Sequence, residues 1–202
     1  MNKLNKMLSI ILAVITIFLA VCLKDFKLLL FLIYIALLYI IKMNQSLKFV
    51  ALTFGFLGGF LGFLLHLYKV TTWYDTFIHF ISGIFVGLVA IYILNKFKLY
   101  DKNNILFNTL FIILFSLSVS ALWEVIEFIL DKIFNSDMQR KLTGVNDTMK
   151  DIICALLGNI LFNITFYFEY KYKNKILIHK FVDNMTGGSY GRENFRTIKT
   201  TR

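Results

Sequence analysis

Long apolar runs, separated by short polar segments, dominate the chain. Six such runs stand out, at residues 7–23, 28–41, 49–68, 77–94, 105–130 and 152–168. A helix needs about 20 apolar residues to cross a bilayer core of ~30 Å, and most of the runs approach that length. The second run is short, but Lys27 and Lys42 flank it and can reach toward the interface with their long side chains. The pattern predicts an all-α, polytopic transmembrane bundle of about six helices.

Composition supports a membrane location and a single domain. Hydrophobic residues make up 58% of the 202 positions, whereas soluble domains usually contain about 45–50%. We expect a transmembrane helical domain over residues 1–168, followed by a basic, partly disordered tail over residues 169–202. The net charge of +10 comes from Lys and Arg between the runs and in this tail. That placement indicates membrane topology and makes nucleic acid an unexpected partner.

The distribution of basic residues also predicts an orientation. With six spans, the side that holds both termini carries more Lys and Arg than the opposite side, so we expect both termini in the cytoplasm of a multi-pass cell-membrane protein. The lysines at positions 171, 173 and 175 would then lie against anionic lipid headgroups. An alternative for the first run is a signal peptide with Lys3 and Lys6 as its basic start. A retained helix is the preferred interpretation, because Val21 precedes Cys22 where a lipoprotein cleavage box requires a small residue.

Polar residues inside the last three runs are the candidates for function. Asp75 and His79 are four residues apart at the start of the fourth run, and Asp147 and Asp151 are four apart at the start of the sixth. Such spacings place side chains on one face of a helix. The fifth run carries a polar stripe at steps of three or four residues, made of Ser116, Ser120, Glu124, Glu127 and Asp131.

These polar faces are expected to meet at one membrane face. When helices alternate in direction, the start of the fourth helix, the end of the fifth and the start of the sixth lie on the same side, which the orientation above makes extracytoplasmic. An ionised residue at a helix centre costs roughly 2.5–3.5 kcal/mol. The carboxylates therefore need protonation, water, a basic partner or a divalent cation. Lys150 lies between Asp147 and Asp151 in sequence, but ideal helical geometry points it away from their face.

Small residues predict close helix packing in the same region. The small-xxx-small pattern of membrane helix contacts occurs on two of the runs. It is formed by Gly83 and Gly87 on the fourth run and by Gly55, Gly58, Gly59 and Gly62 on the third.

A structural interpretation also exists for two of the acids. Asp75 and Asp147 suit the first turn of a helix, where they can cap it or interact with its dipole. Glu124 and Glu127 lack this explanation, because they lie within an apolar helix.

Three motifs together resemble a known family. They are Tyr74-Asp75-Thr76-Phe77-Ile78-His79-Phe80, Trp123-Glu124-Val125-Ile126-Glu127-Phe128, and Asp147-Thr148-Met149-Lys150-Asp151 with Leu157-Gly158. Over residues 50–168 they resemble the YjdF-type predicted membrane proteins, a family of unknown function. A more distant similarity is to VanZ-like proteins of the cell envelope, which pair an Asp/His element, a Glu-x-x-Gln helix and a later Asp followed by Asn and Gly. Glu127 departs from that second pattern, because it stands where the pattern has Gln.

Three functions are compatible with these residues. The first is a membrane-embedded enzyme or ligand-binding protein that acts on a lipid or envelope precursor, with Glu124, Glu127, His79 and Asp151 as catalytic candidates. His79, Glu124, Glu127, Asp147 and Asp151 are the hypothetical ligands of a divalent metal such as Mg²⁺, Mn²⁺ or Zn²⁺, and Asp75 is a further polar residue of the site. The second function is a non-catalytic scaffold or partner subunit. The third is an ion-coupled transporter.

Overall fold

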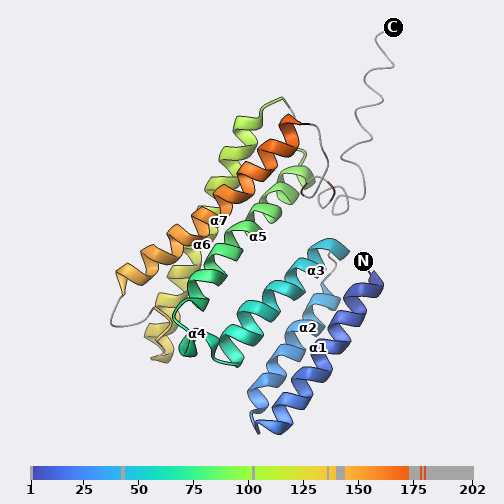
Figure 1. The fold of residues 1–202 in the computed structure, drawn as a ribbon, viewed down its shortest axis with the longest axis vertical. Helices are drawn as coiled ribbons and strands as arrows, with labels where there is room; N and C mark the ends of the chain where they lie inside the picture. Colours follow the sequence, from blue (N-terminus) through green and yellow to red (C-terminus); the bar gives the residue numbers. More distant parts are fainter. Residues whose placement is uncertain are drawn as a thin grey trace. The chain divides into compact units, whose positions relative to one another are not determined.

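The computed structural model describes residues 2–41, 44–101, 103–135, 137–139, 144–172, 178 and 180. The described residues are helical apart from the connecting turns (Figure 1), which confirms the all-α fold. Among these described residues, five helical stretches are long and apolar enough to cross a membrane. They are Asn2–Cys22, Gln45–Leu64, Tyr74–Lys96, Ile105–Phe134 and Val145–Lys171. The chain divides into two compact units, Met1–Tyr74 and Asp75–Arg202.

The first unit is an up-and-down arrangement built on α1 (Asn2–Cys22). A 3₁₀ turn, η1 (Phe26–Leu29), leads into α2 (Leu30–Ile40). Their combined rise is about 24 Å, so this element is shorter than a full span. It nevertheless returns along α1, because the Tyr39 hydroxyl at its end lies 3.0 Å from the Ser9 hydroxyl near the start of α1.

The third apolar run of the sequence differs from its predicted form. It begins as α3 (Gln45–Phe54), continues as a π-helix, η2 (Gly55–Leu64), and stops before a separate short helix, α4 (Leu67–Val70). His66 separates them with a left-handed backbone, at φ 60°. The predicted single helix over 49–68 is therefore wrong at its end, because a left-handed residue cannot continue the right-handed hydrogen-bond ladder.

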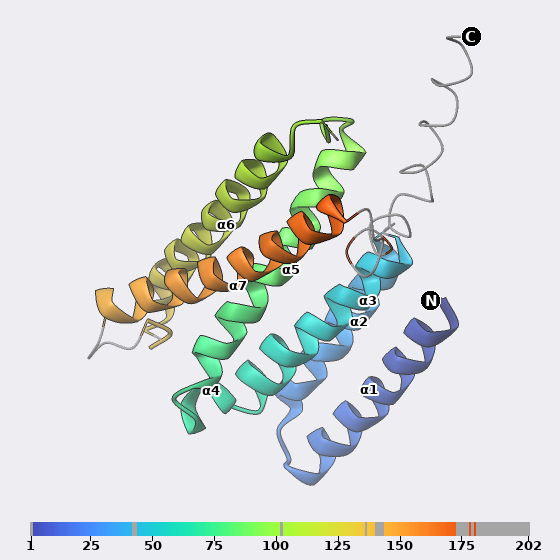
Figure 2. The same cartoon turned by 45° about the horizontal axis from the view of Figure 1, so that its top comes forward.

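The second unit consists of three long helices, α5 (Tyr74–Lys96), α6 (Ile105–Phe134) and α7 (Val145–Lys171). Both views show α6 and α7 running in opposite directions (Figures 1 and 2), so the end of α6 and the start of α7 share one end of the unit. Asn104 caps α6 by accepting a hydrogen bond from the Phe107 amide at 3.0 Å. The predicted tail over 169–202 lies almost wholly outside the described residues.

Helix α6 has its polar residues inside and its apolar residues outside. Its buried positions are Asn108, Ile112, Ser116, Ser120, Glu124 and Glu127. Leu114, Leu122 and Ile133 on its other faces are each more than half exposed. In water this distribution would be unfavourable, whereas a lipid environment favours it because hydrocarbon contacts the apolar side chains.

Glycines bring α5 and α7 into backbone contact. A Cβ atom at Gly83 of α5 would collide with the carbonyl oxygen of Ala155 on α7. A Cβ atom at Gly158 of α7 would collide in the same way with the carbonyl oxygen of Phe80 on α5. Asn159 adds a hydrogen bond from its side-chain amide to the Gly83 carbonyl at 3.2 Å. This close crossing fixes how the polar faces of the two helices meet.

Candidate functional site

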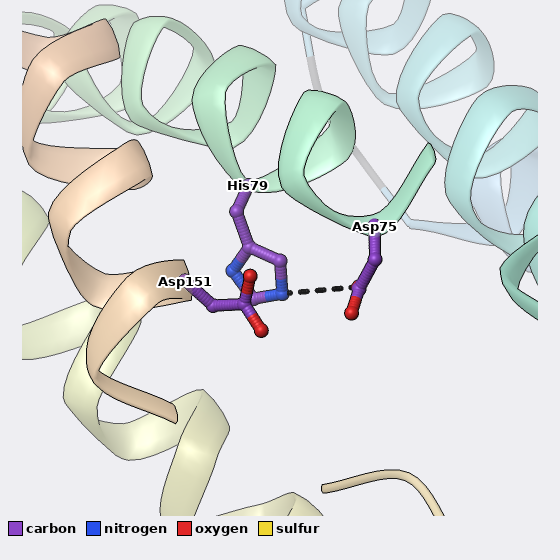
Figure 3. A group of neighbouring side chains, drawn as sticks. All are labelled: Asp75, His79 and Asp151. Atoms are coloured by element: carbon purple, nitrogen blue, oxygen red, sulfur yellow. Dashed lines mark ion pairs between the residues drawn. The ribbon is translucent and has the colours of Figure 1, made fainter. Parts of the chain in front are cut away.

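The first turns of α5 supply two neighbouring polar side chains. Asp75 and His79 are one turn apart, and His79 Nε2 lies 3.5 Å from Asp75 Oδ1 (Figure 3). His79 is buried, while Asp75 keeps partial exposure at the end of the unit. The hydroxyl of Ser82 donates to the His79 carbonyl at 2.7 Å, which occupies that backbone oxygen. The imidazole therefore has a partly exposed carboxylate as its neighbour on the same helix.

Helix α7 brings Asp151 to this pair. The close α5–α7 contact described above places its carboxylate beside the imidazole (Figure 3), and only 2% of the residue is exposed. One potential ligand atom each from Asp75, His79 and Asp151 lies within 4.8 Å of the other two. Asp151 Oδ1 has no hydrogen-bond partner among the described residues. Three side chains from two helices therefore converge on one small volume, and one oxygen there lacks a hydrogen bond.

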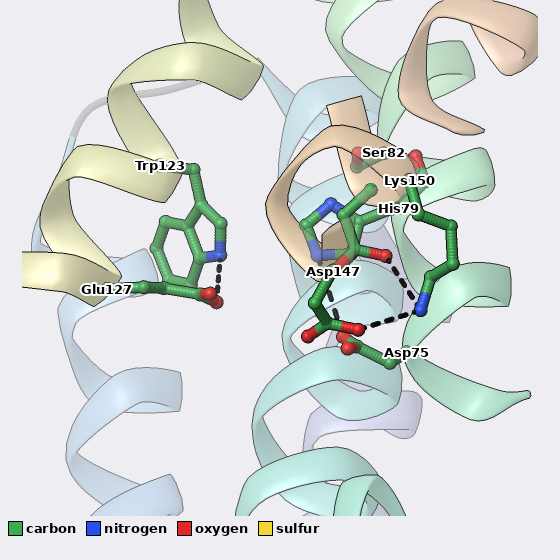
Figure 4. Close-up of polar contacts among 8 residues, drawn as sticks. Asp75, His79, Ser82, Trp123, Glu127, Asp147 and Lys150 are labelled. Carbon is green, nitrogen blue, oxygen red and sulfur yellow. Dashed lines mark hydrogen bonds and ion pairs between the residues drawn. The ribbon is translucent and has the colours of Figure 1, made fainter. Parts of the chain in front are cut away.

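Lys150 contributes to the same region, contrary to the expectation from ideal helical geometry. Its ammonium lies 2.9 Å from Asp147 Oδ1 (Figure 4). The same ammonium lies 3.6 Å from Asp151 Oδ1. The prediction that it points away was wrong, because a lysine side chain has four methylene groups and can fold back along its own helix. Lys150 is more than one-third exposed, while both aspartates are buried. It partly compensates the negative charge at the start of α7.

Glu124 is buried on α6 and faces the end of the unit that contains His79. Thr148 and Gln139 lie beside its carboxylate, and it interacts electrostatically with His79. Gln139 also donates hydrogen bonds to the Glu124 carbonyl at 3.2 Å and to Thr148 Oγ1 at 3.1 Å. Within the described part of the chain, Glu124 Oε1 has no hydrogen-bond partner. Like Asp151, Glu124 therefore has one buried oxygen to offer a ligand or water.

Glu127 has a definite partner on its own helix. The indole nitrogen of Trp123 donates to Glu127 Oε1 at 2.7 Å (Figure 4). Glu127 is buried, whereas Trp123 is about half exposed and continues the apolar outer surface of α6. Glu127 interacts electrostatically with Glu124 and His79. It borders the three-residue group without contributing a ligand atom to it.

Asp131, the last residue of the predicted polar stripe, holds a turn instead. Its two carboxylate oxygens accept hydrogen bonds from the backbone amides of Met138 at 2.9 Å and Gln139 at 3.0 Å. This contact fixes the described residues after α6 and positions the Gln139 side chain beside Glu124. Asp131 is consequently a structural residue that acts on the site through Gln139.

Several contributors could not be recognised from the sequence. Gln139 and Thr148 carry no spacing signal, and they reach Glu124 only because the α6–α7 connection folds back. Asn163, in contrast, could have been found from its spacing, because it follows Asn159 by four residues. In the structure the Asn163 amide donates to Asn159 Oδ1 at 2.9 Å, which extends a buried polar row along α7.

The three-residue group fits a divalent cation in its donor set. One imidazole and two carboxylates suit borderline and harder ions such as Zn²⁺ and Mn²⁺. Two ligand atoms on a tetrahedral ion with bonds of ~2.1 Å lie ~3.4 Å apart. The ligand atoms here lie within 4.8 Å of one another, so side-chain rotations would draw them together around an ion. Of the predicted ligands, His79 and Asp151 belong to this group, Asp75 joins them, and Glu124, Glu127 and Asp147 lie around it.

Sequence comparison now supplies the family. The model of the family described as "Predicted membrane protein (DUF2238)" matches residues 5–172. The chain belongs to this DUF2238 family. The match covers all of the long helices, including α1, which lies outside the range of the motif resemblance. No curated protein and no solved structure matches the chain. The DUF2238 match gives no support to the more distant VanZ-like similarity.

Proposed function

We propose that this DUF2238 protein binds a divalent cation within the membrane and uses it to act on a lipid or envelope precursor. The observation that carries the proposal is the convergence of Asp75, His79 and Asp151, whose ligand atoms lie within 4.8 Å of one another. The YjdF-type motifs coincide with the residues that line this site.

The energetics of burial support a cation. Asp151 is almost fully buried, and its Oδ1 atom has no hydrogen bond from a described residue. A buried carboxylate is costly unless it is paired, protonated or bound to metal. Lys150 is 3.6 Å away and partly exposed, so it offers only weak compensation. A divalent ion between Asp75, His79 and Asp151 would supply the missing charge directly.

The surrounding residues support hydrolytic chemistry at such an ion. Asp75, His79 and Asp151 would hold such an ion, and the ion would supply Lewis-acid chemistry by making a nearby water more acidic. Glu124 has a buried, unpaired oxygen and is the candidate base that takes the proton. The resulting hydroxide would form a bond to a phosphoryl or acyl centre. The ester bond to the leaving oxygen would break, and that oxygen would receive the proton from Glu124.

The position of the group supports a membrane-borne substrate. It lies at the end of the second unit where α5 and α7 begin and α6 ends, and Asp75 is partly exposed there. We propose that this end faces the outside of the cell membrane and that both termini are cytoplasmic. The excess of lysines on the opposite side of a six-pass arrangement supports this orientation. The substrate would then approach from the outer leaflet.

Metal analysis of purified protein tests the cation site. We expect one Mn²⁺ or Zn²⁺ per chain by elemental analysis and calorimetry, with at least tenfold weaker binding in Asp151→Asn and His79→Ala. Glu169→Gln is the matched control, because Glu169 is also a buried acid of α7 and its carboxylate accepts a hydrogen bond from the Ile178 amide instead. Wild-type affinity in Asp151→Asn would contradict the proposal.

A non-catalytic scaffold is the second candidate, and the Trp123–Glu127 hydrogen bond of 2.7 Å favours it. In that case the acids stabilise packing alone. Glu124→Gln separates the two functions. If the site is catalytic, the variant should still bind the metal but lose turnover. Wild-type behaviour of the Glu124→Gln, Glu127→Gln double variant would select the scaffold. Ion flux in proteoliposomes, abolished by the same changes, would select the transporter.

A further inference from the structure

A second polar cluster lies in the first unit, at the end where α1 and α3 begin and α2 ends. Asn5 of α1 donates hydrogen bonds from its amide to the Gln45 carbonyl at 2.8 Å and to Gln45 Oε1 at 3.0 Å. Ser9, one turn later, contacts the Tyr39 hydroxyl. The ring of Tyr39 in turn lies 4.2 Å from Lys48 Nζ. We call Asn5, Ser9, Tyr39, Gln45 and Lys48 the Lys48 cluster.

Lys48 is the unusual member of this cluster. Only 6% of the residue is exposed, whereas lysines are almost never buried without a partner. Its ammonium contacts the face of the Tyr39 ring, and no carboxylate of the described residues forms an ion pair with it. A cation–π contact does not replace the hydration that a buried ammonium loses.

The sequence of the unit excludes an internal counterion. Residues 1–74 contain seven lysines and a single acidic residue, Asp25. Asp25 lies beyond the opposite end of α1, where it caps η1 by accepting from the Lys27 amide at 3.1 Å. Lys3 and Lys6 lie on the first turns of α1 and add exposed positive charge at the same end of the unit as the Lys48 cluster. The charge that neutralises Lys48 must therefore come from outside this unit.

We propose that the Lys48 cluster binds the phosphate headgroup of an anionic lipid. Three helix ends meet at the cluster, which places it at a membrane face, where basic residues attract anionic lipid headgroups. Asn5 Oδ1 is buried and lacks a hydrogen-bond partner among the described residues. It is an acceptor for a headgroup hydroxyl, so a phosphate that carries a hydroxylated headgroup, as in phosphatidylglycerol, matches both Lys48 and Asn5.

Lipid titration tests this inference. Short-chain phosphatidylglycerol or phosphatidylcholine is titrated into the full chain in an uncharged detergent, and the affinity is measured by calorimetry. We expect wild-type protein to prefer phosphatidylglycerol, and Lys48→Met to bind it about tenfold more weakly, the effect of losing one charge-assisted contact. Lys48→Arg should retain the preference, because it keeps the charge. Lys69→Met is the matched control, since it removes an exposed lysine of the same unit from α4.

Three outcomes would overturn the inference. Equal binding of the two lipids by wild type would show no anionic site. Equal phosphatidylglycerol affinity in Lys48→Met and wild type would place the counterion of Lys48 in another part of the chain. Competition by inorganic phosphate at the same affinity would assign the site to a soluble anion. Divalent-metal binding should be unchanged in Lys48→Met, so this experiment is independent of the metal proposal.

Discussion

The Nζ atom of Lys150 lies 3.6 Å from Oδ1 of Asp151, the carboxylate that completes the three-residue group with Asp75 and His79. An ammonium and a divalent cation compete for the same oxygen, because each is attracted by its negative charge. The partial exposure of Lys150 weakens this competition by solvent screening. For the proposed cation site, Lys150 would therefore lower the affinity for the metal without abolishing binding.

Removing this competitor should tighten metal binding. We expect Lys150→Met to bind Mn²⁺ about three- to tenfold more strongly than wild type, measured by electron paramagnetic resonance of free Mn²⁺. Lys96→Met is the control, because Lys96 ends α5 at the other end of the unit. Unchanged or weaker binding in Lys150→Met would show that the lysine does not compete for Asp151.

The glycine contact between α5 and α7 should be essential for the site. Gly83→Ala adds a Cβ atom where the Ala155 carbonyl already lies, and overpacking of this kind costs about 1–3 kcal/mol or more. We expect a lower unfolding temperature and weaker Mn²⁺ binding, because α5 and α7 each carry residues of the proposed cation site. In Gly59→Ala the new Cβ has nothing within 4 Å, so both properties should stay near wild type. Equal behaviour of the two variants would contradict the packing described for α5 and α7.

Asp131 should slow hydrogen exchange at the backbone amides of the turn that follows α6. In Asp131→Ala the amides of Met138 and Gln139 lose their acceptors, and hydrogen bonds to charged groups contribute about 1.5–3 kcal/mol. We expect at least tenfold faster hydrogen exchange at these two amides by mass spectrometry. Glu169→Gln should leave both amides unchanged, because the Glu169 carboxylate contacts Ile178 instead. Slow exchange in Asp131→Ala would mean that other groups hold the turn.

Trp123 and Glu127 should be energetically coupled. A double-mutant cycle with Trp123→Phe and Glu127→Leu isolates the hydrogen bond from indole to carboxylate. We expect a coupling energy of about 1–3 kcal/mol from denaturation in mixed detergent micelles, since the acceptor is a buried acid. The same cycle with Trp73→Phe in place of Trp123→Phe should give no coupling. A negligible value for the Trp123 cycle would remove the main support for a purely structural role of Glu127.

Local sequence patterns were sufficient for the membrane helices. The apolar runs at 77–94, 105–130 and 152–168 became α5, α6 and α7, because apolar length and helix period are local properties. Each helix is longer than its run, and α7 begins at Val145, well before residue 152. The break at His66 could not be predicted in this way. Its left-handed backbone depends on how η2 and α4 pack, and no neighbouring glycine or proline indicates it.

For the candidate site too, some features follow from the sequence and others follow only from the tertiary structure. The sequence alone determined that acids and a histidine occupy one face of three helices, because side-chain direction follows the helical period. Only the tertiary structure decided that Asp151 comes close to Asp75 and His79, that Asp131 holds a turn, and that Lys150 folds back toward two aspartates. These outcomes depend on the backbone contact at Gly83 and Gly158 and on flexible side-chain torsions. Neither the distance between two helices nor a lysine rotamer is encoded in residue spacing.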